Sequence, residues 1–220
     1  MSDSTTDGLT RRHLFQIGGV GVAMATVSAA CGSSKKGSTT ATAGASTTTT
    51  TTVSQSDITW LRTLTSIEEA AVAAYQKVID ASTALGLPSS VSTSVAAFQK
   101  HHKDHANLLA KATTDAGGTP FTTANPVVMG QLDPGLSSMK TATDALDVLY
   151  GMEKAIAATY QSSVGSFSKK SYNQSVMAVG GAEAKHATML AAALGLNDKL
   201  ITNGAFQATT GAVSSGTGIS

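Results

Sequence analysis

Apolar side chains recur at steps of three and four residues along four separate segments of the chain. This spacing places them on one face of an α-helix, so each segment predicts an amphipathic helix that turns one face to a core. The first helix is predicted to start at Asp57 as its N-cap and to run to about Ala84, where Gly86-Leu87-Pro88 breaks the pattern. The second follows Ser89 or Ser90 and ends near Gly117-Gly118.

Two further helices are predicted in the second half of the chain. Their apolar stripes run from Leu146 to Val164 and from Val176 to Ala193, and Gly195 ends the last one. Residues 117–137 hold three of the four prolines and four glycines, which predicts a long connection between the second and third helices. Two short connections and a long one are typical of a four-helix bundle made of two antiparallel pairs joined by a crossover.

The two halves of this all-α region repeat each other. Residues 67–76 align without gaps on 152–161, and 102–109 align on 183–190. The first helix therefore matches the third and the second matches the fourth, which indicates a duplicated helical hairpin.

Each predicted core stripe is interrupted at its middle by ionisable side chains. An ionised carboxylate in a core costs several kcal/mol unless it is paired or bound to a cation. Six such residues at one depth of four helices indicate a shared counter-charge, which two divalent cations would supply. The six candidate metal ligands are Glu68, His102, His105, Glu153, Glu183 and His186.

The donor atoms narrow the choice of metal. Cys31 is the only cysteine, so a metal in the bundle would be held by nitrogen and oxygen, which favours two iron or manganese ions, with zinc as a further candidate. Taken alone, each of His102 and His105 is better explained as a hydrogen-bonded core histidine than as a metal ligand. Tyr75 and Tyr160, each seven residues after its glutamate, are either core filler or hydrogen-bond partners of a ligand across the bundle.

The spacing of these residues resembles that of the ferritin-like superfamily of dimetal carboxylate proteins over roughly residues 57–195. The resemblance implies that Glu68 and Glu153 are terminal ligands, that Glu183 bridges the metals, and that His105 and His186 are the two imidazole ligands. The family has a glutamate where this chain has His102. The exchange removes a bridge and a negative charge, which leaves a less symmetric pair of metals, a single metal or a zinc site as alternatives.

The first 55 residues have the pattern of a targeting segment and a linker. Arg11 and Arg12 precede a short apolar run, Ile17 to Ala30, that is too short to span a bilayer. The pair resembles a twin-arginine export signal, and the small residues before Cys31 resemble a lipobox, although Ser28 stands where leucine is usual. Residues 1–31 are thus predicted to be a signal region whose Cys31 is acylated, the alternative being an ordinary buried or reactive cysteine.

The remaining ranges follow from composition. Residues 32–55 are rich in Thr, Ser and Ala and predict a disordered linker, 56–196 form the bundle, and 197–220 predict a flexible tail. An acylated Cys31 would tether the protein to the outer face of the cell membrane, with the periplasm or cell wall as the location if acylation is absent. A tethered bundle with a loose tail is expected to be a monomer or dimer and not a cage.

Charge excludes one class of partner. The net charge is only +1, and the sequence has no concentrated basic face, so no nucleic acid is expected to bind.

The resemblance implies reaction with dioxygen or peroxide, as in ferrous iron oxidation or peroxide removal. The other two hypotheses are a lipoprotein that binds metal or a partner without turnover, and a bundle that has lost its metal and serves as a structural or interaction module.

Overall fold

The computed structural model describes residues 53–196 and 209–220, and every regular element in these ranges is an α-helix. The helices are α1 (Gln55–Ala81), α2 (Ser89–Asp115), α3 (Pro126–Ser138), α4 (Ala142–Ser163) and α5 (Lys170–Ala193). Four of them are long, as predicted, which confirms the all-α bundle. The predicted export signal with Arg11 and Arg12, Cys31 and the linker as far as residue 52 lie outside the described residues.

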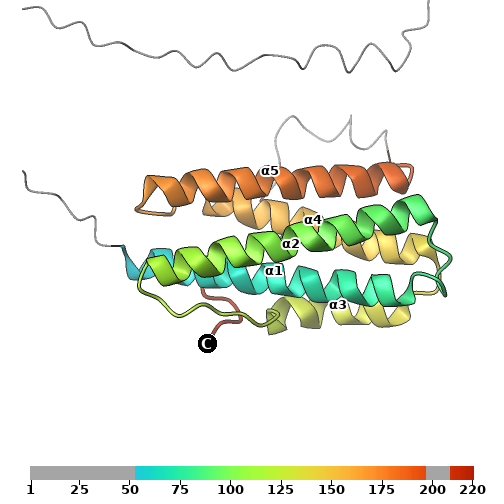
Figure 1. Cartoon of the computed structure of the whole chain (residues 1–220), viewed down its shortest axis with the longest axis horizontal. Helices are drawn as coiled ribbons and strands as arrows, with labels where there is room; N and C mark the ends of the chain where they lie inside the picture. The colour runs from blue at the N-terminus through green and yellow to red at the C-terminus, as the bar shows by residue number, and fades with distance from the viewer. Residues whose placement is uncertain (1–52, 197–208) are drawn as a thin grey trace, which may run out of the picture. The chain divides into compact units, whose positions relative to one another are not determined.

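The four long helices lie side by side as two hairpins (Figure 1). α1 packs along α2, and α4 packs along α5, which agrees with the duplicated hairpin in the sequence. Contacts of α1 with α4 and of α2 with α5 close the ring, so α1 and α5 lie diagonally opposite. One core is therefore enclosed by one face of each long helix.

The predicted apolar stripes form this core. Leu64, Tyr75, Leu149 and Tyr160 are fully buried. Two predicted core positions at helix ends are exposed instead: Val164, which is 41% exposed as the residue that caps α4, and Ala193, the last residue of α5. Helix ends leave the bundle, so periodicity overestimates the core there.

The N-terminus of α1 differs from the prediction. Ser54 is the N-cap and its side chain accepts a hydrogen bond from Asp57 N at 3.1 Å. Asp57 lies in the first turn, fully buried, and its carboxylate accepts hydrogen bonds from Ser168 N at 2.9 Å and Ser168 Oγ at 2.5 Å. The residue predicted to cap its own helix therefore ties α1 to the loop before α5.

The long connection contains a helix that the prolines had concealed. Asn125 caps α3 by accepting hydrogen bonds from Val127 N and Val128 N, and Pro126 occupies the first turn, where its missing N–H costs nothing. Val128 and Leu136 are buried, and α3 packs against both α1 and α4. The crossover is therefore partly a helix that covers one side of the bundle.

The expectation of a flexible tail is wrong for residues 209–220, whereas 197–208 lie outside the described residues. Gly216 N donates to Thr63 Oγ1 and Val213 N donates to Thr159 Oγ1, both at 2.9 Å. Ile219 is only 5% exposed. This segment therefore packs on α1 and α4, because small residues let its backbone reach the threonine hydroxyls of both helices.

None of the helices in the described ranges is both long enough and apolar enough to cross a membrane.

Candidate metal centre

All six predicted ligands meet at mid-height of the bundle, and each long helix contributes at least one. Glu68 comes from α1, Glu153 from α4, His102 and His105 from α2, and Glu183 and His186 from α5. The three glutamates and His102 are fully buried, His186 is 3% exposed, and His105 is partly buried. The structure thus brings the six side chains together; their role as ligands stays a prediction.

Helix periodicity explains why these polar groups point inward. Glu68 continues the stripe of Leu61 and Leu64, and Glu153 continues that of Leu149, so each replaces an apolar core residue. On α2 and α5 the ionisable pair has a spacing of three residues, which puts both side chains on one face about one turn apart.

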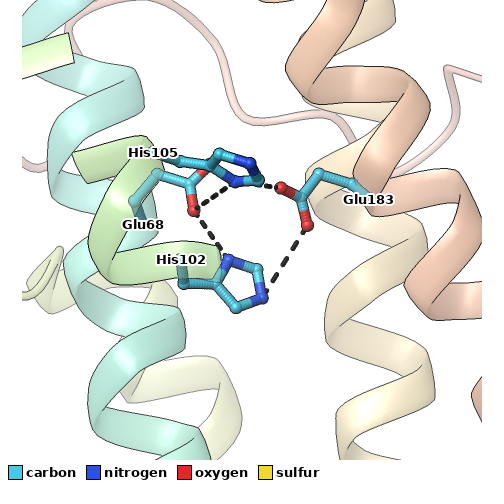
Figure 2. Close-up of side chains that lie close together, drawn as sticks. All are labelled: Glu68, His102, His105 and Glu183. Atoms are coloured by element: carbon cyan, nitrogen blue, oxygen red, sulfur yellow. Dashed lines mark hydrogen bonds and ion pairs between the residues drawn. The ribbon is translucent and has the colours of Figure 1, made fainter. Parts of the chain in front are cut away.

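One half of the cluster joins Glu68, His102, His105 and Glu183. His102 Nδ1 lies 2.7 Å from Glu68 Oε2. His105 Nδ1 lies 2.7 Å from Glu183 Oε1 and 3.7 Å from Glu68 Oε2. Figure 2 shows Glu68 and the two histidines converging on Glu183 from the opposite hairpin. Donor atoms of these four residues all lie within 4.8 Å of one another, close enough for one ion.

The other half joins Glu153, Glu183, His186 and again His102. His102 Nε2 lies 3.0 Å from Glu153 Oε1 and 3.7 Å from Glu183 Oε2. His186 Nδ1 lies 3.1 Å from Glu183 Oε2 and 3.5 Å from Glu153 Oε1. These four residues also offer donor atoms within 4.8 Å of one another. The cluster therefore consists of two donor groups that share His102 and Glu183.

His102 neutralises part of the buried charge. Burial by itself lowers the pKa of His102, but attraction to and hydrogen bonds with Glu153 and Glu68 outweigh it and hold the pKa well above its usual value. The ring therefore carries both protons in the metal-free protein and donates one to each glutamate. Burial by itself raises the pKa of Glu68 and of Glu153, but attraction to His102 and hydrogen bonding with it, helped by His105 and His186 respectively, outweigh burial and lower both pKa values.

Among the three glutamates, Glu183 is the one whose negative charge is least stabilised by its neighbours, because only its pKa is raised. Burial and the negative charge of Glu68 raise the pKa of Glu183, and its contacts with His105 and His186 only partly oppose this. Burial lowers the pKa of His105, but its interactions with Glu183 and Glu68 prevail and raise the pKa to about 9. A cation beside Glu183 would stabilise its ionised form directly.

Three buried atoms test whether the cluster fits metal. Glu153 Oε2, Glu183 Oε1 and His105 Nδ1 have no hydrogen-bond partner among the described residues. The last two lie 2.7 Å apart, but they approach off the hydrogen-bond direction. Unlike the other two, Glu153 Oε2 forms no ion pair among the described residues, and a buried polar atom without a partner costs about 1–3 kcal/mol. The three atoms are two carboxylate oxygens and one imidazole nitrogen, which are donors that suit divalent iron or zinc. The residues present therefore fit a metal ion.

Two tyrosines donate hydrogen bonds to Glu153 and Glu68 across the bundle. Tyr75 of α1 donates to Glu153 Oε1 of α4 at 2.5 Å, and Tyr160 of α4 donates to Glu68 Oε1 of α1. Each tyrosine therefore serves the glutamate of the other hairpin. Both hydroxyls are buried, and burial and the neighbouring carboxylates raise the pKa of each tyrosine well above its usual value, so they stay protonated donors.

Two contacts of His186 lie outside the predicted set. The Phe98 ring stacks on His186 at a centroid distance of 4.2 Å, and His101 Nδ1 lies 3.0 Å from His186 Nε2. His101 is exposed, yet its ring stacks on that of His186. Its position off the core stripe gave no signal of this contact.

Two neighbouring acidic residues do not join the cluster. Asp104 is exposed and pairs with Lys100 at 2.6 Å. Glu69 is partly buried, and burial and the nearby Glu68 raise its pKa. Neither residue belongs to the two donor groups.

Comparison with known proteins agrees with this geometry. A model of the ferritin-like domain family matches residues 56–196. The chain belongs to the ferritin-like family. No curated protein and no solved structure matched it. His102, where the resemblance implied a carboxylate, lies between Glu68 and Glu153.

Proposed function

We propose that this ferritin-like domain holds two divalent metal ions, iron or manganese, and uses them to oxidise ferrous iron or to consume peroxide. The observation that carries the proposal is the convergence of three glutamates and three histidines from four helices on one buried spot. Bound iron would supply the redox chemistry, while the protein fixes the ligands and limits access of water.

The chain's own residues have clear tasks in such a centre. Glu68 and Glu153 would hold one ion each and Glu183 would contact both, with His105 and His186 as nitrogen donors. Tyr75 and Tyr160 fix the orientation of the terminal glutamates, and His101 fixes that of His186. Phe98, whose ring stacks on His186, is one of the residues that line an apolar pocket of about 170 Å³, which has room for a small molecule such as dioxygen.

A second candidate function is metal binding without turnover, or a structural role for the bundle. His102 favours it, because an imidazolium between Glu68 and Glu153 supplies positive charge that a metal would otherwise provide. Because His102 already neutralises part of the negative charge of the buried glutamates, a second metal ion would stabilise the centre less.

Anaerobic titration with ferrous iron, followed by admission of air, separates these functions. Two bound equivalents and rapid dioxygen consumption with a new near-ultraviolet or visible absorbance are expected for the redox function. Binding without oxidation supports the second candidate. A protein that binds no ferrous iron, manganese or zinc would refute the metal centre altogether.

We also propose that the protein is exported and anchored to the outer face of the membrane through an acylated Cys31, as a monomer or dimer. The motif around Arg11 and Arg12 and the small residues before Cys31 support this. Cys31→Ser is expected to release the protein from the membrane fraction, and Arg11→Lys together with Arg12→Lys to block export. Membrane retention of the Cys31→Ser protein would contradict the anchor.

A further inference from the structure

The two donor groups of the centre share two residues, and each shared residue turns a different atom to each group. Glu183 points Oε1 at His105 and Oε2 at His186, at 2.7 and 3.1 Å. His102 turns Nδ1 to Glu68 and Nε2 to Glu153, at 2.7 and 3.0 Å. Each group therefore has its own complete set of two oxygens and two nitrogens.

The shape of the imidazole ring limits what His102 can do. Its two nitrogen lone pairs lie in the ring plane and point away from each other, so one ion cannot bind both. The ring is fully buried and packs against Tyr75 at a centroid distance of 5.2 Å, which holds it in place. His102 must therefore serve one group only or link the two.

The spacing of the donor atoms suits an ion in each group. Zinc-like ions bind nitrogen and oxygen at about 2.0–2.2 Å in tetrahedral sites, which separates the donor atoms by about 3.4 Å. The separations around the first group are 2.7, 2.7 and 3.7 Å. Around the second they are 3.0, 3.1, 3.5 and 3.7 Å. Small shifts of these side chains would therefore complete both sites.

We propose, on the basis of the two-metal function above, that His102 bridges the two ions through its ring nitrogens and that Glu183 bridges them through its carboxylate oxygens. Nδ1 of His102 joins the ion held by Glu68 and His105, and Nε2 joins the ion held by Glu153 and His186. Binding at both nitrogens requires the imidazolate, so both ring protons leave to solvent when the two sites fill.

This bridge determines the class of metal. Each ion receives two imidazole nitrogens, whereas a bridging glutamate in place of His102 would leave each with one. Imidazole donors suit iron, zinc and copper, while manganese prefers carboxylate and water. Of the two metals named in the proposed function, the centre therefore favours iron over manganese.

Titration of the purified protein with cobalt(II), followed by visible absorbance and calorimetry, tests the bridge. The wild-type protein is expected to bind two equivalents with the intense bands of four-coordinate cobalt. His102→Gln is expected to weaken both equivalents at least tenfold. The matched controls His105→Gln and His186→Gln are each expected to weaken one equivalent mainly. If His102→Gln leaves either equivalent at wild-type affinity, the bridge is refuted.

Two further measurements keep the test independent of the folding of that variant. A crystal structure of the zinc-loaded wild-type protein is expected to show an ion about 2.0–2.1 Å from each ring nitrogen of His102. An ion at one nitrogen only would refute the bridge while leaving the metal-binding function intact. A wild-type protein that binds no metal would instead refute the proposed function.

The manganese affinity of a His102→Glu variant tests the role of His102 in metal selection. His102→Glu exchanges the two nitrogens for a carboxylate bridge, so it is expected to bind manganese(II) at least tenfold more tightly than the wild-type protein does. Circular dichroism and thermal unfolding establish that the variant is folded. Equal manganese affinity in the two folded proteins would refute the role of His102 in metal selection.

Discussion

Glu153 and Glu183 belong to different helices yet share the same donor group, so their removal has one joint consequence. Glu153→Ala and Glu183→Ala are each expected to lower metal content, with Glu183→Ala affecting both ions because its two oxygens face different groups. Elemental analysis after dialysis measures this. Glu69→Ala is the matched control, since Glu69 neighbours Glu68 but lies outside the cluster. Full metal content in both variants would show that the ligand assignment is wrong.

Proton competition at His105 predicts a pH dependence of metal binding. The pKa of His105 is raised from 6.5 to about 9, so its ring is protonated at neutral pH and must lose a proton to bind an ion. Metal affinity is therefore expected to rise with pH up to about 9. Calorimetric titrations across this range measure the slope. A His105→Gln protein is expected to show a smaller slope, and an affinity independent of pH would contradict the prediction.

The raised pKa of His105 predicts that the stability of the metal-free protein falls as pH rises, whereas its metal affinity increases. Because the folded-state pKa of His105 lies above its ordinary value of 6.5, its contribution is fully present below pH 6.5 and is lost as pH rises through about 9. Urea unfolding with and without metal is expected to show that metal compensates for this loss at alkaline pH.

Among the elements, the start of α1 is tied to the loop before α5 by one carboxylate. Asp57→Ala removes the acceptor of Ser168 N and Ser168 Oγ, and is expected to lower the free energy of unfolding by about 1–3 kcal/mol. Chemical denaturation measures the loss. Asp80→Ala, an exposed position on the same helix, is expected to change stability by less than about 0.5 kcal/mol. Equal effects of the two changes would refute the tie.

Helix α3 shows how one element is stabilised by others. Asn125 caps it and also donates to Ser66 Oγ of α1 and to Thr217 O of the C-terminal segment. A single amide therefore joins three parts of the chain. These hydrogen bonds hold the start of α3, where Pro126 lies, against α1 and the C-terminal segment.

At the scale of the whole molecule, the segment 209–220 acts as a strap across the bundle. Gly218 has a φ of +71°, and a Cβ there would collide with the Asn125 side chain. Gly218→Ala is expected to lower the free energy of unfolding by about 1–3 kcal/mol and to expose the segment to proteases. Gly211→Ala, where φ is +86° but no atom lies near, isolates the backbone strain and is expected to cost less. Wild-type stability of Gly218→Ala would show that the strap is not held there.

Much of this molecule follows from local pattern. On an α-helix, the position of a residue in the sequence determines both its height along the helix and the direction that its side chain faces. Four ionisable residues lie at the middle of their apolar stripes, which predicts that they meet at one level of the bundle: Glu68, His102, Glu153 and Glu183. Two segments of the structure were not predicted from this periodicity. Pro126 hid α3, although Val128, Leu132 and Leu136 recur at four-residue steps, and the glycines of the last residues hid a packed segment.

The sequence by itself determined the four long helices, their pairing as a duplicated hairpin and the six side chains that meet, because these depend on periodicity within each segment. Only the tertiary structure decided which nitrogen of His102 faces which glutamate, that Glu183 divides its oxygens, and that exposed His101 reaches His186. Those details depend on rotamers set by packing between helices far apart in the chain, and spacing along one helix carries no information about them.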